Sequence, residues 1–474
     1  MRGRLALVGI LVVASGTARL WGATDRDRAK ALVEQALVLA NQAQDPAART
    51  DALSRAASVL AQFEPRRALQ IVEPLDPTHE QAVAMGRVAV ALARENRLLG
   101  LATLLRLDDR SASIAALGRI VADVARDHLD EAEQILDQVP NIATRRVIEL
   151  QITVEMAAQD PGGPEAAYQH SRTFADSITD VAIRAEAEAS VAAAAARVDP
   201  AQAAELIGTI SVPSAQDLAR RNAVGVLAGS SFAAGEQLAR QIADPLQRGW
   251  ALVALAQSPT ARSQPDKARA LLRDAAAAAA GLEELRDRGA LLEGVALALG
   301  PVDPEAALGA LPEVWPTHRR YVLQCELAAG LATTARDRAQ ELIEDAWVEV
   351  RRQDDPMVRR EIAQATLVAA LQVRQQLFDD CLAAQPELTQ TVLPAVAEEL
   401  ASTDPALARR AAEAVVDPVQ RELALSRAAV RLAERDPAAA LQWEPLLQQP
   451  EARAALLTAC AAALVGLELS WPPL

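Results

Sequence analysis

The chain has 474 residues, of which 51% are apolar but only 3% aromatic, so alanine, leucine and valine supply most of the apolar content. Small apolar side chains suit closely packed helices and suit a β-sandwich or barrel poorly. The formal net charge of −15 excludes a general nucleic-acid binder, which needs a basic surface, and the 23% charged content is that of an ordinary folded protein.

The first segment has the composition of an export signal. Two arginines lie in Met1–Arg4, Leu5–Ala14 is apolar throughout, and small residues follow it. The apolar run is too short to cross a bilayer, which takes about 20 residues. We expect residues 1–23 to be a cleaved signal peptide and the protein to be exported to the periplasm, cell envelope or cell exterior. An uncleaved anchor is the alternative, and no membrane span is expected after cleavage.

A repeat built on the dipeptide Asp-Pro runs through the rest of the chain. Aspartate at an N-cap accepts hydrogen bonds from free amide groups, and proline at the first helical position lacks the amide that would go unpaired. Each Asp-Pro therefore predicts the start of a helix. The dipeptide begins at residues 45, 76, 160, 199, 244, 303, 355, 404, 417 and 436.

Two kinds of amphipathic helix alternate along the chain, and we call them the leading and the trailing helix of each hairpin. Leading helices are expected to start near residues 45, 76, 109, 141, 180, 213, 244, 283, 316, 355, 386, 417 and 449. Most intervals between these starts are 31–33 residues, and three are 39. Seven extra residues are about two helical turns, so the long repeats should extend their trailing helices, at Pro164–Ile178, Lys267–Leu282 and Asp337–Arg352.

A hairpin of this length cannot bury its own apolar face, whereas stacked copies can. The sequence therefore predicts an all-α fold, an elongated and curved α-solenoid of about 13 hairpins that forms a single domain over residues 24–474. The last helix, Glu451–Leu467, has no partner after it in the sequence and is expected to cap the stack.

The array resembles bacterial tetratricopeptide-like (TPR-like) helical repeats, and HEAT-like repeats are the alternative. The hairpin at 417–448 carries the best match, with small and large residues alternating at Leu425, Ala429, Leu432 and Ala440. The period is shorter than the usual 34 residues, and most of the bulky aromatics of the family are replaced by Ala, Leu or Val. The resemblance implies a scaffold that binds proteins or peptides in a groove lined by leading helices, and it implies no catalytic residue.

Arginine recurs four residues after the expected start of many leading helices. The positions are Arg49, Arg145, Arg184, Arg248, Arg320, Arg359, Arg421 and Arg453. A cation in the first turn opposes the helix dipole, so each arginine needs a partner. One explanation is a set of ion pairs with neighbouring acids that fixes hairpin stacking; the other is a row of arginines offered to an acidic ligand.

No pattern in the sequence indicates catalysis, a metal site or a cofactor. The four histidines lie far apart and outside any zinc-binding spacing, and the three cysteines, Cys325, Cys381 and Cys460, lie in apolar helical surroundings where we expect them to be buried. The sequence has no phosphate loop and no Gly-x-Ser-x-Gly motif. We therefore expect a protein that is not an enzyme. Trp250 and Tyr321, near the starts of leading helices, are the candidate groove residues.

These observations predict an exported, non-enzymatic scaffold that binds a protein or peptide partner. A net charge of −15 favours long-range encounter with a basic partner, an effect that salt weakens. A structural role in assembling the cell envelope is the alternative. A third alternative is an all-α hydrolase or lyase.

Overall fold

The computed structural model describes residues 23–139, 141–158, 160 and 162–467, and these residues form 27 α-helices, two short 3₁₀ helices and no strand. The chain is therefore an all-α helical-repeat protein, as predicted. The helices pack into two compact units. Unit 1 holds residues 121–346, and unit 2 holds the described residues up to 120 together with those from 347 onward. The expectation of one continuous domain stays a prediction.

All thirteen expected leading helices are present, and the largest displacement is at α4, which starts at His79 instead of 76. Their bounds are α2 Pro46–Leu60, α4 His79–Glu95, α6 Arg110–Asp127, α8 Ile142–Ala158, α10 Val181–Val198, α12 Pro213–Ser230, α14 Pro245–Ala256, α17 Leu285–Leu299, α19 Thr317–Leu331, α21 Pro356–Val373, α23 Pro386–Ala401, α25 Pro418–Ala433 and α27 Pro450–Leu464.

Twelve trailing helices follow leading helices, and three of them are long, as predicted from the intervals. The long ones are α9 Pro164–Ser177, α16 Pro265–Ala280 and α20 Arg336–Arg352, with 14, 16 and 17 residues. The other nine have five to ten residues: α3 Pro65–Val72, α5 Arg97–Leu104, α7 Leu129–Asp137, α11 Pro200–Thr209, α13 Phe232–Arg240, α18 Pro304–Ala310, α22 Gln375–Ala384, α24 Pro405–Glu413 and α26 Pro437–Leu441. The short elements α15 (Pro259–Arg262), η2 (Leu311–Glu313) and η3 (Glu444–Leu446) lie in connections.

Aspartate caps recur at the starts of these helices. Eight of the ten Asp-Pro dipeptides place aspartate at the N-cap and proline at the first helical position, with the carboxylate accepting from amides of the first turn. The prediction is wrong at two. After Asp76 the side chain of Thr78 caps α4 instead. Asp160 precedes α9 by several residues, and its carboxylate binds other side chains.

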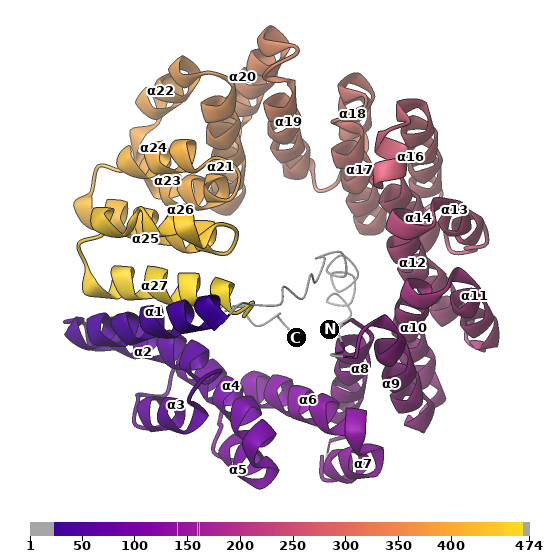
Figure 1. Ribbon diagram of the computed structural model, residues 1–474. Coiled ribbons are helices and arrows are strands. Elements are labelled where there is room, and N and C mark those ends of the chain that lie inside the picture. The colour runs from indigo at the N-terminus through magenta and orange to yellow at the C-terminus, as the bar shows by residue number, and fades with distance from the viewer. Residues whose placement is uncertain (1–22, 140, 159, 161, 468–474) are drawn as a thin grey trace. The chain divides into compact units, whose positions relative to one another are not determined.

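Stacking of leading helix on leading helix builds the core of each unit, and in unit 1 the trailing helices form a second layer beside them (Figure 1). Alanine makes this possible because it lets helix axes approach closely. In α10 the run Val191–Ala196 is buried all round the helix, between α8, α9, α11 and α12. The aromatic-poor composition thus corresponds to tightly packed layers of small side chains.

The last helix does not cap the stack, which corrects the prediction. In unit 2, α27 packs along α1 (Ala23–Gln42) and also contacts α2 (Figure 1). Leading helices such as α10, α12 and α23 contact the next leading helix and their own trailing helix, so α27 meets α2 and α1 as these helices meet their neighbours. Helix α1 therefore supplies the trailing helix of the thirteenth hairpin. The sequence order hid this partner because it lies at the opposite end of the chain.

Candidate functional site

Two clefts open between neighbouring trailing helices of unit 1. The α18–α20 cleft has a volume of about 350 Å³, and the α11–α13 cleft about 320 Å³. Each is bounded by two successive trailing helices, with the intervening leading helix, α19 or α12, beneath. The two clefts thus occupy the same place in the repeat.

Apolar and aromatic groups line one side of the α18–α20 cleft. They are Leu308 on α18, Leu311 and Pro312 in η2, Tyr321 on α19 and Leu342 on α20. The guanidinium of Arg320 lies over the Tyr321 ring, 4.8 Å from its centroid, and its Nη2 donates to the tyrosine hydroxyl at 3.0 Å. The arginine therefore holds the ring in a fixed position on the cleft wall.

Charged groups lie on the α20 side of the same cleft. Arg338 Nη1 contacts Glu341 Oε2 at 2.8 Å, and this hydrogen bond raises the pKa of the already basic guanidinium. Gln324, which is 7% exposed, donates from Nε2 to the carbonyl of Leu342 at 2.8 Å and to Asp345 Oδ2 at 3.0 Å. The cleft therefore combines an apolar wall with two carboxylates and two guanidiniums.

The α11–α13 cleft is less charged. Small residues on α11, namely Ala201, Ala204 and Gly208, face Ala234, Gln237 and Gln241 at the other side, and a Cβ added to Gly208 would meet no atom within 4 Å. Arg220 is the charged lining residue, and it is held by Asp217 Oδ1 at 2.6 Å and Gln216 Oε1 at 2.9 Å.

The two clefts share a register position on their leading helices. Gln324 lies eight residues after the N-cap Pro316 of α19, and Arg220 lies eight residues after the N-cap Val212 of α12. Both side chains are polar, and both are held by hydrogen bonds within their own hairpin. The clefts are therefore equivalent features of the repeat with different linings.

The two residues predicted to line a groove have different surroundings in the structure. Tyr321 lines the α18–α20 cleft. Trp250 is half-buried and packs on α17, where a Cβ on Gly294 would come within 2.6 Å of its ring. Trailing helices contribute half of the lining residues of the α18–α20 cleft and most of those of the α11–α13 cleft, whereas the family resemblance places the groove on leading helices.

Three of the eight recurring first-turn arginines bind the backbone, and the others have side-chain partners where a contact is seen. Arg49, Arg248 and Arg421 donate to carbonyl oxygens six residues earlier, on Ala43, Ile242 and Val415, and Arg288, which the sequence reasoning missed, does the same to Leu282. Acidic partners were expected and are wrong for these helices, because a loop carbonyl fills that role. Acidic partners are present for two of the predicted arginines, Arg145 with Glu149 and Arg453 with Glu444.

A second recurring contact, absent from the sequence-based reasoning, holds the same loops from the other side. The residue five positions after the N-cap bonds the loop that precedes the next leading helix. Asp217 Oδ2 accepts from Ala243 N and Asp244 N at 3.1 and 2.8 Å; Gln390 and Glu422 accept equivalently from Val416 N and Gln448 N at 2.7 Å. Other leading helices carry Val83, Ala185 or Gly249 at this position, so no regular sequence pattern indicates the contact.

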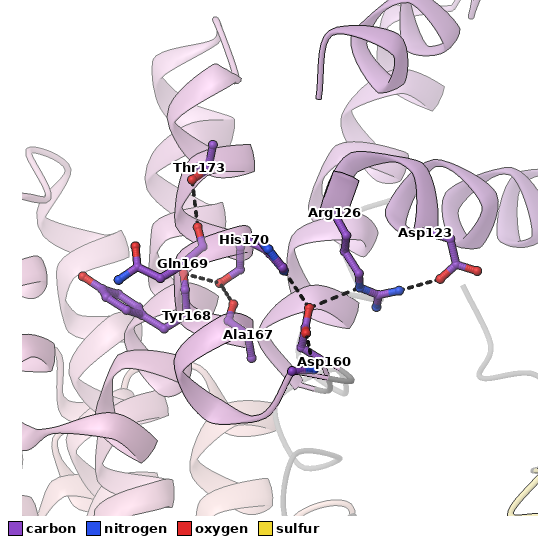
Figure 2. A network of polar contacts seen from close by, with 10 residues as sticks. Asp123, Arg126, Asp160, Ala167, Tyr168, Gln169, His170 and Thr173 are labelled. Carbon is purple, nitrogen blue, oxygen red and sulfur yellow. Dashed lines mark hydrogen bonds and ion pairs between the residues drawn. The ribbon is translucent and has the colours of Figure 1, made fainter. Parts of the chain in front are cut away.

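A buried carboxylate in unit 1 lies beside a histidine and an arginine. Asp160 is 3% exposed at its side chain, and its Oδ2 lies 2.9 Å from His170 Nδ1 and 3.3 Å from Arg126 Nε (Figure 2). Burial raises the pKa of Asp160. The hydrogen bonds from His170 and Gly162 N and the charge of Arg126 lower the pKa by more than burial raises it, so the carboxylate stays ionised. Figure 2 shows Arg126 also reaching Asp123. The network joins α6 to α9, which is a structural role.

Other features of chemical interest are buried or dispersed. All three cysteines are buried, as predicted, and burial raises the pKa of the Cys460 thiol to about 12. Within the described ranges, no three His, Cys, Asp or Glu side chains gather in a way that would hold a metal ion. Over the same part of the chain, no helix has the length and apolar character needed to span a bilayer.

No protein-family model and no curated protein matches the sequence. A solved structure described as a circular tandem repeat protein with novel repeat topology and enhanced subunit contact surfaces is similar at 16% identity, covering 93% of this chain and 96% of that chain, with a TM-score of 0.18. Evidence on function therefore comes from the geometry of the chain itself.

Proposed function

We propose that the protein is an exported, TPR-like scaffold without catalytic activity that binds a polypeptide partner. One observation carries this proposal: two clefts of similar volume recur at the same place in the repeat, between trailing helices of unit 1. Repetition of a cleft along a helical array suits a ligand that is itself extended and presents side chains at intervals.

The dimensions of the clefts favour side chains over a whole small molecule. Each volume is at the lower limit of the roughly 300–1,000 Å³ of small-molecule pockets, so each cleft accommodates one or two side chains of a bound segment. Leading helices α12 and α19 are separated by two others, α14 and α17, so a segment that reaches both clefts must pass over several hairpins.

The charges favour a basic partner. The chain carries a net charge of −15, which raises the encounter rate with cations at long range. In the α18–α20 cleft the carboxylates of Glu341 and Asp345 can each receive a lysine or arginine of the partner, while Leu311 and Leu342 receive an apolar side chain. We expect complex formation to weaken as ionic strength rises, because such contacts are screened by salt.

The test is to fill one cleft by a substitution and then to capture a partner from cell-envelope extract. Gly208→Trp places an indole in the α11–α13 cleft, where a Cβ meets open space. Gly229→Trp on α12 is the matched control, because its Cβ also meets no atom within 4 Å and it does not line the cleft. Loss of one salt-sensitive partner with the first variant and retention with the second supports the proposal. Equal capture by both variants contradicts it.

The rival functions give different results in the same preparation. A structural envelope factor would bring down no discrete partner with either variant. A hydrolase or lyase would show turnover above background in a broad substrate screen, or a stoichiometric metal by elemental analysis. We expect neither turnover nor metal.

The export proposal has its own test. The predicted signal lies outside the described residues except for its last residue, Ala23, at which α1 begins. N-terminal sequencing of exported protein should begin between Thr17 and Thr24. Intact Met1 on cytoplasmic protein would contradict the export proposal.

A further inference from the structure

Helix α27 is buried as an interior helix is buried, although it lies last in the described order. Nine of its residues are buried, among them Ala454, Leu457 and Cys460, and they lie all round the helix. The neighbours responsible are α25 and α26 on one side and α1 and α2 on the other. A terminal helix of a solenoid ordinarily keeps a polar outer face. The sequence of α27 is therefore built to be covered on both sides.

The contact between α27 and α1, which we call the seam, differs from the other contacts of α1. On the α2–α3 side α1 has three polar links: Lys30 to Glu64 at 2.6 Å, Glu34 to Arg67 at 2.5 and 2.8 Å, and Arg26 to the Gln62 carbonyl. Across the seam, the described residues form no hydrogen bond or ion pair. The buried side chains of α1, which packs on both α27 and α2, are apolar and include Ala29, Val33, Ala36 and Ala40, all fully buried.

The seam also lacks a covalent connection. Every other leading helix is joined to its trailing helix by a short loop, whereas α27 and α1 come from opposite ends of the chain. Because the polar links fasten α1 to α2 and α3, separation at the seam leaves α1 attached to its own neighbours. Opening there exposes two complementary surfaces: the apolar face of α27 and the apolar face of α1.

We propose that the seam is an assembly surface whose second occupant is another copy of this chain, with α27 of one copy packing on α1 of the next. The two faces are different from one another, so the contact is head-to-tail and its repetition gives a cyclic oligomer or a filament. The attachment of both faces to one chain gives them a high effective concentration, so the single chain closes on itself until the seam is opened.

Exchange between tagged copies tests this proposal. His-tagged and Strep-tagged full-length chains are mixed, warmed to a few degrees below the melting temperature, cooled, and passed through both affinity columns; discrete species are then sized by light scattering. We expect soluble mixed oligomers at least tenfold above the unwarmed mixture. Absence of mixed oligomers after warming would overturn the proposal.

A circular form of the chain provides the decisive comparison. Joining residue 474 to residue 24, the first residue after the predicted signal, with a split intein keeps the buried side chains of the seam and tethers α1 to its own α27. Mixed oligomers should fall at least tenfold in the circular form. Undiminished mixing of circular chains would show that another surface is responsible and would refute the seam.

Matched leucine truncations locate the effect and allow for loss of stability. Leu457→Ala on α27 and Leu393→Ala on α23 each remove a side chain that is at most 1% exposed, but α23 lies within the stack between α21 and α25. The first variant should exchange at least tenfold faster than the second at equal distance from their melting temperatures. Equal rates would contradict a seam-specific opening.

Discussion

The loop contact made by Asp217 gives a sharp test of how hairpins are held in register. Its carboxylate is 5% exposed and accepts three hydrogen bonds, from Arg220 Nη1 at 2.6 Å, Ala243 N at 3.1 Å and Asp244 N at 2.8 Å. Asp217→Ala removes all three at once. The next loop then keeps the hydrogen bond from Arg248 to the Ile242 carbonyl but loses its contact with α12 through Asp217.

The expected loss of stability follows from those contacts. A hydrogen bond to a charged group contributes about 1.5–3 kcal/mol. Residues Ala243 and Asp244 are exposed, so water replaces part of what the loop amides lose, and Arg220 keeps its bond to Gln216. We therefore expect Asp217→Ala to lower the free energy of unfolding by about 2–3 kcal/mol, less than the simple sum. Asp217→Asn, which keeps an acceptor oxygen but not the charge, should lose about half as much.

Two measurements check this expectation. Urea unfolding followed by circular dichroism gives the stability difference, and amide hydrogen exchange reports the protection of Ala243 and Asp244 directly. Asp266→Ala is the control, because its side chain is 97% exposed and its pair with Arg269 contributes no more than about 1 kcal/mol. The reasoning is refuted if Asp217→Ala is within 0.5 kcal/mol of the control (roughly the accuracy of such comparisons) or leaves protection of the two amides unchanged.

Three further predictions follow from other contacts. Gly294→Ala should lower the stability of the protein while Trp250 is present, because the added Cβ would lie 2.6 Å from the indole ring. In a Trp250→Ala background the same change should raise stability by up to about 1 kcal/mol. A double-mutant cycle with no coupling would contradict this packing. Asp417→Ala should cost about 0.5–2 kcal/mol by removing an N-cap, whereas Asp76→Ala should change little, and equal losses in thermal unfolding would count against the cap assignment. Because the folded-state pKa of Asp160 is lowered, the stabilisation by its carboxylate is present above a pH of about 4 and is lost as the pH falls further. Asp160→Asn should therefore flatten the acidic part of a profile of urea midpoint against pH. An unchanged profile would disprove the stabilising role of Asp160.

The hairpins could be predicted from the sequence because their starts are encoded locally. An aspartate and a proline at a helix start act within one turn, so Asp45, Asp244 and Asp417 marked helices without knowledge of the tertiary structure. The seven-residue excess in three intervals likewise gave the long helices α9, α16 and α20, because added turns leave the apolar face where it was.

The partner of the last helix could not be predicted from local pattern. Packing of α27 on α1 joins opposite ends of the chain, and no spacing rule connects them. One signal was present: between Ala454 and Leu464 the only polar side chain besides the Cys460 thiol is Thr458, too little for the polar outer face of a capping helix. That signal excludes a cap but does not name the partner.

The candidate site was predicted less well than the fold. Tyr321 was placed on a groove, and it lines the α18–α20 cleft, but the clefts are built by pairs of trailing helices whose approach depends on loops and on side-chain volumes. Trp250 has the same sequence features and packs against Gly294 instead. A glycine on a neighbouring helix decided between the two roles, and that neighbour cannot be identified from the sequence around Trp250.

The pairing of α1 with α27 makes this fold sensitive to the order in which the chain is synthesised. Helix α1 is among the first elements to leave the ribosome, and α27 follows several hundred residues later. At about 5–20 residues per second the apolar face of α1 waits for tens of seconds before its partner exists. A chain that terminates before α27 leaves that face of α1 without its partner helix. Coverage of α1 is therefore complete only after nearly all of the described chain has been synthesised.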